Sequence, residues 1–514
     1  MSPFAVPAIV FITVVTVVIG AFGYKISRNT SDFLVASRTV SPRLNASAIS
    51  GEYLSAASFL GVAGLIMVNG VDMLWYPVGF TAGYLAMLLY VAAPLRRSGA
   101  YTLPDFAEAR LRSTGVRTLA TGFVVLIGWL YLVPQLQGAG LTLTTVTGAP
   151  SWVGAVVVGA VVTLNTAVGG MRSITFVQAF QYWVKLTAIA FPAMVLLAVW
   201  FHRDGTPSPA QQPLLEDGDR WLVPLTGLGA HPLFTDYSLI LATFLGTMGL
   251  PHVLVRFYTN PDGRAARTTT LVVLGLLGIF YLFPTVYGAL GRVYVPHLLR
   301  DGNADAVVLV LPDAALGGLP GQLFGGLVAA GAFAAFLSTS SGLVVSVAGV
   351  VSQDLLSRRL DGVLAFRVAG TACALGTLVL TVASSGLAVA HAVELAFAVA
   401  ASTFCPLLML GIWWRGLTAL GAVAGMVVGG ALSTAAVLAT MFGAVLTGWQ
   451  GTVVAQPALI TVPVAFLVMF GVSLVTPQPL HVGRTMVRLH TPEHLVLDRG
   501  SYHPENRRTT TGTG

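Results

Sequence analysis

Runs of about twenty apolar residues follow one another along almost the whole chain. A helix that crosses the hydrocarbon core of a bilayer needs about 20 predominantly apolar residues. Only 9% of the 514 residues are charged, against about a quarter in a typical soluble domain. The sequence therefore predicts an all-α membrane protein with about thirteen spanning helices. The predicted spans are 3–22, 46–69, 72–94, 117–147, 151–170, 174–201, 237–258, 268–291, 319–353, 366–385, 388–414, 417–442 and 457–476.

The distribution of Lys and Arg predicts how the chain is oriented, because cytoplasmic loops carry an excess of these residues. With the N-terminus outside, 22 of the 27 Lys and Arg residues fall in cytoplasmic segments, Arg256 among them, and Lys185 lies within a span. An odd number of spans places the C-terminus in the cytoplasm. The first run, 3–22, follows no basic residue and is too long for the core of a signal peptide, so we expect it to remain as a span.

The segments between the spans favour a transporter over an enzyme. The largest are the outer loops 202–236 and 292–318 and the tail after Thr476, and none could hold a catalytic or kinase domain. No His-Glu-x-x-His motif or aspartate pair at a membrane face is present, so neither an enzyme nor an organic cofactor is expected. The basic residues lie in loops between spans, which does not indicate nucleic-acid binding.

Two predicted spans contain residues that interrupt a helix. The second has a polar cluster from Ser50 to Ser58 that includes Glu52, and the seventh contains Gly249 and Pro251. Proline lacks the amide hydrogen and clashes with the preceding turn. Interruptions at corresponding places in two halves point to a binding site at the membrane midplane and favour alternating access over a channel. Ordinary kinks filled by neighbouring helices are the alternative.

The ninth span carries four consecutive hydroxyl residues, 338–341. In a membrane helix such hydroxyls often bond to a carbonyl of the preceding turn. Alternatively they could complete a cation site, because an interrupted helix frees carbonyl oxygens and hard cations bind several oxygens.

Several strings in the chain resemble the sodium/solute symporter family. They include 29–38, 51–61, 169–178, 246–257, 337–339, 352–355 and 414–418, and the resemblance runs from about residue 30 to 420. The most similar branch is that of the bacterial cation/acetate symporters, whose members carry short monocarboxylates. The resemblance implies a leucine-transporter-like fold of 5+5 inverted repeats in a bacterial inner membrane. The implied parts are 1–45 (first span and linker), 46–201 (first repeat), 202–236 (outer loop), 237–414 (second repeat), 415–476 (two further spans) and 477–514 (cytoplasmic tail, partly disordered).

The resemblance also implies a sodium site. Its ligands would be the carbonyls of Gly51, Leu54 and Ala335 with the hydroxyls of Ser338 and Thr339. Ala335 and Ser338 are three residues apart, hence on one helical face.

One departure from the wider family bears on stoichiometry. Gln178 stands where sugar-transporting members carry an aspartate for an additional sodium, which favours one cation per cycle. The expected function is sodium-coupled symport of a short monocarboxylate such as acetate. The alternatives are proton-coupled uptake that uses Lys185, and sodium symport of another small solute such as an amino acid.

Three charged residues are expected within the membrane, namely Glu52, Lys185 and Glu394. Intramembrane charges are costly and commonly functional. Lys185 could pair with Glu394, attract the substrate carboxylate, or carry protons. We expect Glu52 and Glu394, together with Gly249 and Pro251, to act in gating or coupling.

The candidate substrate contacts are Ser58, Gln135, Gln137 and Lys185, with hydrogen bonding between helices as the alternative for the three uncharged residues. In a cytoplasmic loop, Asp105 and Arg110 are expected to form a structural or gating pair.

Overall fold

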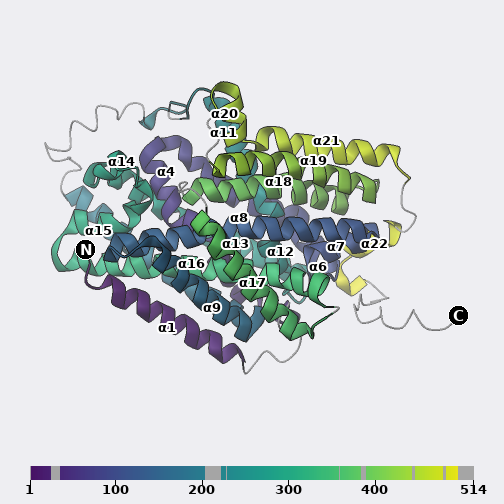
Figure 1. Cartoon of the computed structure of the whole chain (residues 1–514), viewed down its shortest axis with the longest axis horizontal. Coiled ribbons are helices and arrows are strands. Elements are labelled where there is room, and N and C mark those ends of the chain that lie inside the picture. Colours follow the sequence, from purple (N-terminus) through teal and green to yellow (C-terminus); the bar gives the residue numbers. More distant parts are fainter. Residues whose placement is uncertain are drawn as a thin grey trace.

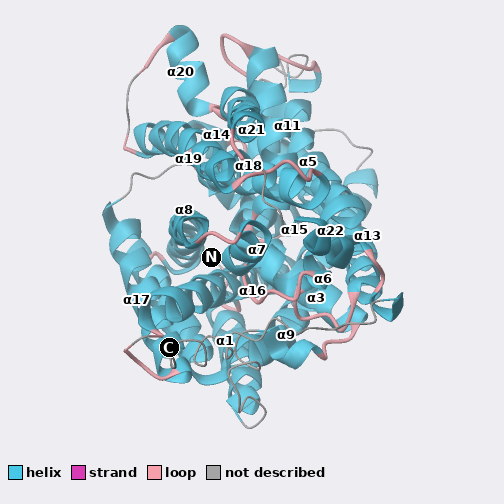
Figure 2. Cartoon of the chain, turned by 90° about the vertical axis from the view of Figure 1, so that its right-hand side faces the viewer, coloured by secondary structure: helices cyan, strands magenta, loops and turns pink. Residues whose placement is uncertain are grey.

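The computed structural model describes residues 2–24, 35–202, 221–226, 228–357, 359–383, 389–442, 446–477 and 482–495. Every regular element within these ranges is helical, and most helices run roughly along the long axis of the molecule (Figure 1). Viewed from one end, many helices are seen along their axes (Figure 2). The first elements are α1 (Ala5–Tyr24), η1 (Ala36–Arg38), α3 (Pro42–Tyr53), η2 (Ala57–Gly61), α4 (Val62–Asn69), η3 (Gly70–Leu74), α5 (Trp75–Ala86), η4 (Met87–Val91), α6 (Ala92–Arg97), α7 (Leu103–Leu111), α8 (Thr114–Thr147) and α9 (Ser151–His202). The rest are α11 (Pro232–Gly249), α12 (Pro251–Phe257), α13 (Gly263–Tyr294), α14 (His297–Arg300), η6 (Ala304–Ala306), α15 (Val307–Leu316), α16 (Gly318–Val351), η7 (Ser352–Leu356), α17 (Gly362–Ala383), α18 (Val389–Trp413), α19 (Ala419–Met441), α20 (Gly448–Ala455), α21 (Ala458–Val475), α22 (Val482–His490) and η8 (Glu493–Leu495).

The length and composition of these helices fit a multi-pass membrane protein. In the described part of the chain, ten helical stretches are long and apolar enough to cross a bilayer, or eleven if the bent pair α11 and α12 counts as one span. This number is below the predicted thirteen. The predicted spans 46–69 and 72–94 fall largely in one helical stretch, Ala57–Arg97, which turns at Gly70, where φ is +75°. The predicted span 151–170 contains an apolar helix of only 17 residues before the chain turns at Gly170.

The two predicted helix interruptions are present. Helix α3 ends at Tyr53, and Leu54 has a non-helical ψ of 85° before the helix resumes in the π-helical turn η2. Helix α11 ends at Gly249, Leu250 is extended with ψ of 115°, and α12 begins at Pro251 after a bend of 43°. The second break follows from local chemistry, because the residue before a proline disfavours the α conformation.

Helix α16 forms the centre of the bundle. Within its apolar stretch 94% of the residues are buried, against 28% in the peripheral α1. It packs against α9, α8, α1 and α3. The start of α1 and helix α22 lie toward opposite ends of the molecule (Figure 1). The central position of α16 brings its hydroxyl run against the break that follows α3.

Candidate functional site

The break after α3 meets the hydroxyl run of α16. Ser338 Oγ lies 2.7 Å from the Gly51 carbonyl oxygen and 3.0 Å from that of Ala335. Thr339 Oγ1 donates a hydrogen bond of 2.6 Å to the Glu52 carbonyl. The residues expected to bind a cation are thus brought to one place, and Ser338 and Thr339 are both fully buried.

Lys185 of α9 reaches into the same place. Its Nζ donates to the Leu54 carbonyl at 2.7 Å, to Ser338 Oγ at 2.6 Å, and to the Gly51 carbonyl. The side chain of Lys185 is fully buried. An ammonium has three N–H donors, and three oxygens accept them here.

The alternative in which Lys185 pairs with Glu394 is wrong. Glu394 of α18 accepts a hydrogen bond from the Tyr76 hydroxyl and lies 3.3 Å from His391 Nδ1. The physical reason lies in the break, because carbonyls that have lost their helical partners are nearer acceptors for Lys185.

A buried ion pair joins the two broken helices. Arg256 Nε of α12 donates to Glu52 Oε2 at 2.6 Å, and the two side chains are 0% and 1% exposed. Arg256 also donates to Thr175 Oγ1 at 2.8 Å and to the Gln178 amide oxygen. Gln178 Nε2 in turn donates to the Ser338 carbonyl at 2.7 Å. This network connects both breaks to α9 and α16.

The sequence analysis counted Arg256 among the cytoplasmic Lys and Arg residues, and the structure shows that its side chain is fully buried beside Glu52. Arg256 thus joins Glu52, Lys185 and Glu394 among the buried charged side chains of the described residues. The sequence did contain one indication that Arg256 belongs to the site, because it lies only five residues after Pro251 and within the string 246–257 that resembles the family.

The expected substrate contacts do not all lie together. Gln135 Oε1 accepts a hydrogen bond of 2.9 Å from the Ala56 amide, so it bridges the break. Ser58 Oγ lies 2.8 Å from the Tyr281 hydroxyl. Gln137 lines a cavity together with residues 298–299 and 302–305. Gln135 therefore contacts the break after α3, Ser58 lies in the turn η2 that follows it, and Gln137 lines that cavity.

Aromatic side chains that sequence reasoning missed pack beside the breaks. The Tyr53 ring lies 4.8 Å from that of Tyr84 and 5.8 Å from that of Phe80. The Phe80 ring lies 5.0 Å from Phe397 and 6.0 Å from Tyr281. Aromatic residues are frequent throughout such spans, so no local pattern distinguishes these five.

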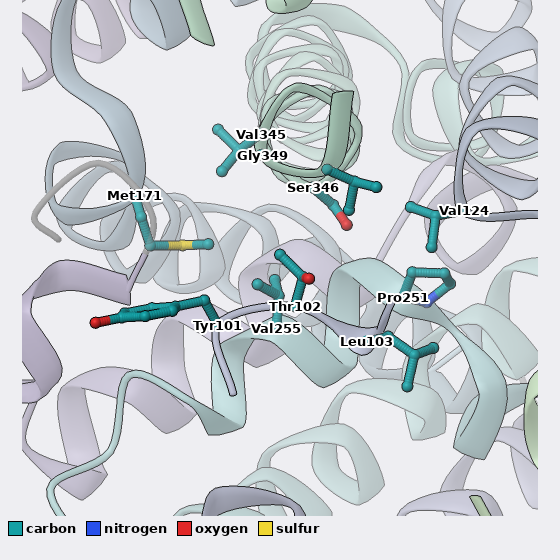
Figure 3. A pocket seen from close by; sticks show the side chains of 11 residues that line it. Tyr101, Thr102, Leu103, Val124, Met171, Pro251, Val255, Val345, Ser346 and Gly349 are labelled. Atoms are coloured by element: carbon teal, nitrogen blue, oxygen red, sulfur yellow. The ribbon is translucent and has the colours of Figure 1, made fainter. Parts of the chain in front are cut away.

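Two cavities of very different size lie on either side of this region. The larger, about 860 Å³, is lined by α4, α8, the start of α9 and the segment that contains Asp305. Asp305 is half-buried, and removal from water raises the pKa of its carboxyl to about 6, although a hydrogen bond from the Val389 amide partly offsets this. The other, about 10 Å³, is lined by Pro251, by residues 101–103 and by Ser346 of α16, among others (Figure 3).

Ion pairs tie helix α7, which begins at Leu103 beside the small cavity, to α8 and η7. Arg117 of α8 contacts Asp105 at 2.8 Å, Glu108 at 2.6 Å and Asp354 of η7 at 2.7 Å. Burial raises the pKa of Asp105, and Arg117 acts in the opposite direction. The expected pair of Asp105 with Arg110 is therefore wrong.

Arg110 contacts a different partner. It donates to the Gly411 carbonyl at 2.8 Å, and burial lowers its pKa to about 10. The partner of Asp105 is instead Arg117, because the first turn of α8 lies against α7.

Known proteins share both the sequence and the fold. An uncharacterized symporter, YwcA, of Bacillus subtilis is 31% identical over 93% of this chain and 96% of its own length. A monocarboxylic acid transporter of Corynebacterium glutamicum is 32% identical over 89% of each chain. The structure of a Na⁺-coupled sialic acid symporter matches with a TM-score of 0.69 and 16% identity, over 93% of this chain and 99% of the symporter. Mhp1, a nucleobase-cation-symport-1 family transporter, matches with a TM-score of 0.54 and 14% identity, over 90% and 99%.

The family assignment rests on sequence as well as on fold. The model of the sodium:solute symporter family matches residues 33–429, which include both breaks and the hydroxyl run of α16. The chain belongs to the sodium:solute symporter family.

Proposed function

We propose that this chain is a secondary active transporter that carries a short monocarboxylate, such as acetate, together with a cation. The family assignment supports symport, and the monocarboxylic acid transporter of Corynebacterium glutamicum, similar over 89% of its length, supports the substrate class.

The observation that carries the substrate class is the balance of charge at the breaks. Lys185 and Arg256 are buried there, and the carboxylate of Glu52 neutralises only one of them. An uncompensated charge in the membrane interior is costly. An anion with a single negative charge would balance the second cation, which favours a monocarboxylate over a zwitterionic amino acid.

The packing around the breaks favours a small substrate. Ser58 and Gln135 supply polar groups, while Phe80 and Phe397 could cover a short apolar tail. We propose that the substrate enters from the larger cavity and leaves through the region of the smaller one.

We propose that transport proceeds by alternating access. The proposed architecture has thirteen spans, ten of which form a 5+5 inverted repeat, with both breaks near the midplane of a bacterial inner membrane. The Lys and Arg distribution supports an external N-terminus and a cytoplasmic C-terminus. Glu52 and Arg256 would couple the two broken helices, because each side chain belongs to one of them.

Two coupling ions are compatible with this function. The family favours sodium, whereas the position of Lys185 among the expected sodium ligands favours the proton.

The proposal can be tested with purified protein in proteoliposomes. Labelled acetate should accumulate when a sodium or a proton gradient is imposed, and pyruvate and propionate should compete. Protein-free vesicles with the same gradients are the control. If labelled proline or alanine accumulated while no monocarboxylate did, the proposed substrate class would be rejected.

A further inference from the structure

The position where the family resemblance places sodium is filled by a side chain of the protein. Lys185 Nζ bonds to the Gly51 and Leu54 carbonyls and to Ser338 Oγ, three of the five expected ligands. The residues present therefore do not fit a free sodium ion at this position while Lys185 stays in place.

The ammonium and a metal ion could not share these oxygens. A sodium ion in contact with Leu54 O and Ser338 Oγ would lie within a few ångströms of Nζ, which is itself 2.7 and 2.6 Å from the same two atoms. Two positive charges so close together repel strongly, and a buried site provides little water to screen them.

The surroundings of Lys185 make the ammonium a stable occupant. Within the described part of the chain, no carboxylate lies within ion-pair distance of Nζ, although the side chain is fully buried. The break after α3 leaves the carbonyls of Gly51 and Leu54 pointing at Nζ instead of into a continuous helix. The free carbonyl oxygens that would bind sodium thus accept hydrogen bonds from the lysine.

We infer that the Lys185 ammonium replaces the coupling sodium ion, so that this chain has no free sodium site at the break after α3. The consequence for coupling rests on the proposed symport function: with sodium displaced, the proton is left as the coupling cation. Truncation of Lys185 should uncover the oxygens and create a sodium site.

The test compares sodium binding in the absence of any substrate. The unfolding temperature of purified protein in detergent is measured in sodium chloride and in choline chloride of equal concentration. Wild-type protein should show no difference. The Lys185→Ala variant should be stabilised by sodium by about 2 °C or more, the effect of a ligand well above its dissociation constant. Lys185→Ala combined with Ser338→Ala should lose this shift.

Uptake provides a second readout. Wild-type proteoliposomes should accumulate acetate in sodium-free buffer under an inward proton gradient. Stabilisation of the wild-type protein by sodium that disappears in Ser338→Ala would overturn the inference, and this comparison holds even if Lys185→Ala fails to fold. A folded Lys185→Ala protein without a sodium shift would also contradict it. Acetate uptake that requires sodium would also contradict the inference, whereas absence of acetate uptake under both a sodium and a proton gradient would reject the proposed substrate and leave the sodium measurement, which contains no substrate, unaffected.

Discussion

Glu52 and Arg256 show how single residues hold the two broken helices together. Both side chains are buried, and each belongs to a helix adjacent to a break. Removal of one partner from a buried ion pair leaves an uncompensated charge and costs about 3–5 kcal/mol. A substitution that removes only Glu52 or only Arg256 is therefore expected to destabilise the fold strongly.

The loss of Glu52 should be worse than the loss of Arg256. Glu52→Gln leaves Arg256 and Lys185 as two cations without a carboxylate at the break, whereas Arg256→Gln leaves one charge of each sign. We expect a lower unfolding temperature and less monodisperse protein in size-exclusion chromatography for Glu52→Gln than for Arg256→Gln.

The double variant provides the control for this prediction. Glu52→Gln with Arg256→Gln should be more stable than Glu52→Gln alone, because the mismatch of charge is smaller. A double variant no more stable than the weaker single variant would show that the two charges do not compensate each other.

The sequence predicts where the two helix interruptions lie, but it does not predict which side chains contact one another there. The interruptions at 52–55 and 249–251 have local causes, a polar cluster and a proline, so they could be predicted. The contact of Lys185 with Leu54 depends on how α9 packs against α3, which no local pattern specifies. Arg256 lies within the predicted span 237–258, but its partner Glu52 belongs to a different span, so the sequence could not show the ion pair.

At the scale of helices, close approach explains one glycine of the site. A Cβ at Gly51 would lie 2.1 Å from the carbonyl oxygen of Gln178, since α3 and α9 approach each other there. Gly275 of α13 has open space around the same position. Both are helical, so the difference between them reports packing alone.

Alanine substitutions at these two positions should have opposite effects. Gly51→Ala forces the backbones apart, and overpacking of this kind typically costs about 1–3 kcal/mol. Gly275→Ala should be neutral or stabilising, because alanine exceeds glycine in helix propensity by about 1 kcal/mol. Thermal unfolding of both proteins measures the contrast. Equal unfolding temperatures would mean that α3 and α9 are not in close contact.

Helix turns account for the difference between the predicted and observed numbers of spans. Hydropathy separated 46–69 from 72–94, and the structure has a turn between them at Gly70, within the 41-residue helical stretch Ala57–Arg97 that counts once by length and composition. The turn at Gly170 similarly separates a short helix from a long one within α9. A helix boundary that depends on the φ angle of a single glycine cannot be predicted from hydropathy averaged over a window of residues.

At the scale of the whole molecule, the two cavities near the breaks differ greatly in volume. The cavity lined by residues 298–299 and 302–305 measures about 860 Å³, whereas the cavity beside Pro251 measures about 10 Å³, room for about one water molecule. Residues 101–103 line the smaller one together with Pro251 and Ser346. For substrate to leave on that side, this segment and η7 would have to separate.

Arg117 is the residue that joins these parts. It contacts Asp105, whose carboxylate accepts hydrogen bonds from the amides of Tyr101 and Thr102, and it contacts Asp354 of η7. Arg117→Met would leave the carboxylates of Asp105, Glu108 and Asp354 close together without their cation. Their repulsion should favour separation of the segment from η7.

Cysteine labelling would detect that separation. Ser346 lines the small cavity, and the native Cys373 and Cys405 are buried, so a Ser346→Cys protein offers one informative thiol. Its alkylation should be roughly fivefold faster with Arg117→Met, the population change expected for about 1 kcal/mol. A cysteine at Leu141 in the larger cavity should react more slowly in the same background, because the proposed alternating-access mechanism opens one side as the other closes. Faster labelling at both positions would indicate general loosening, and unchanged labelling at Ser346→Cys would show that Arg117 does not hold the cavity closed.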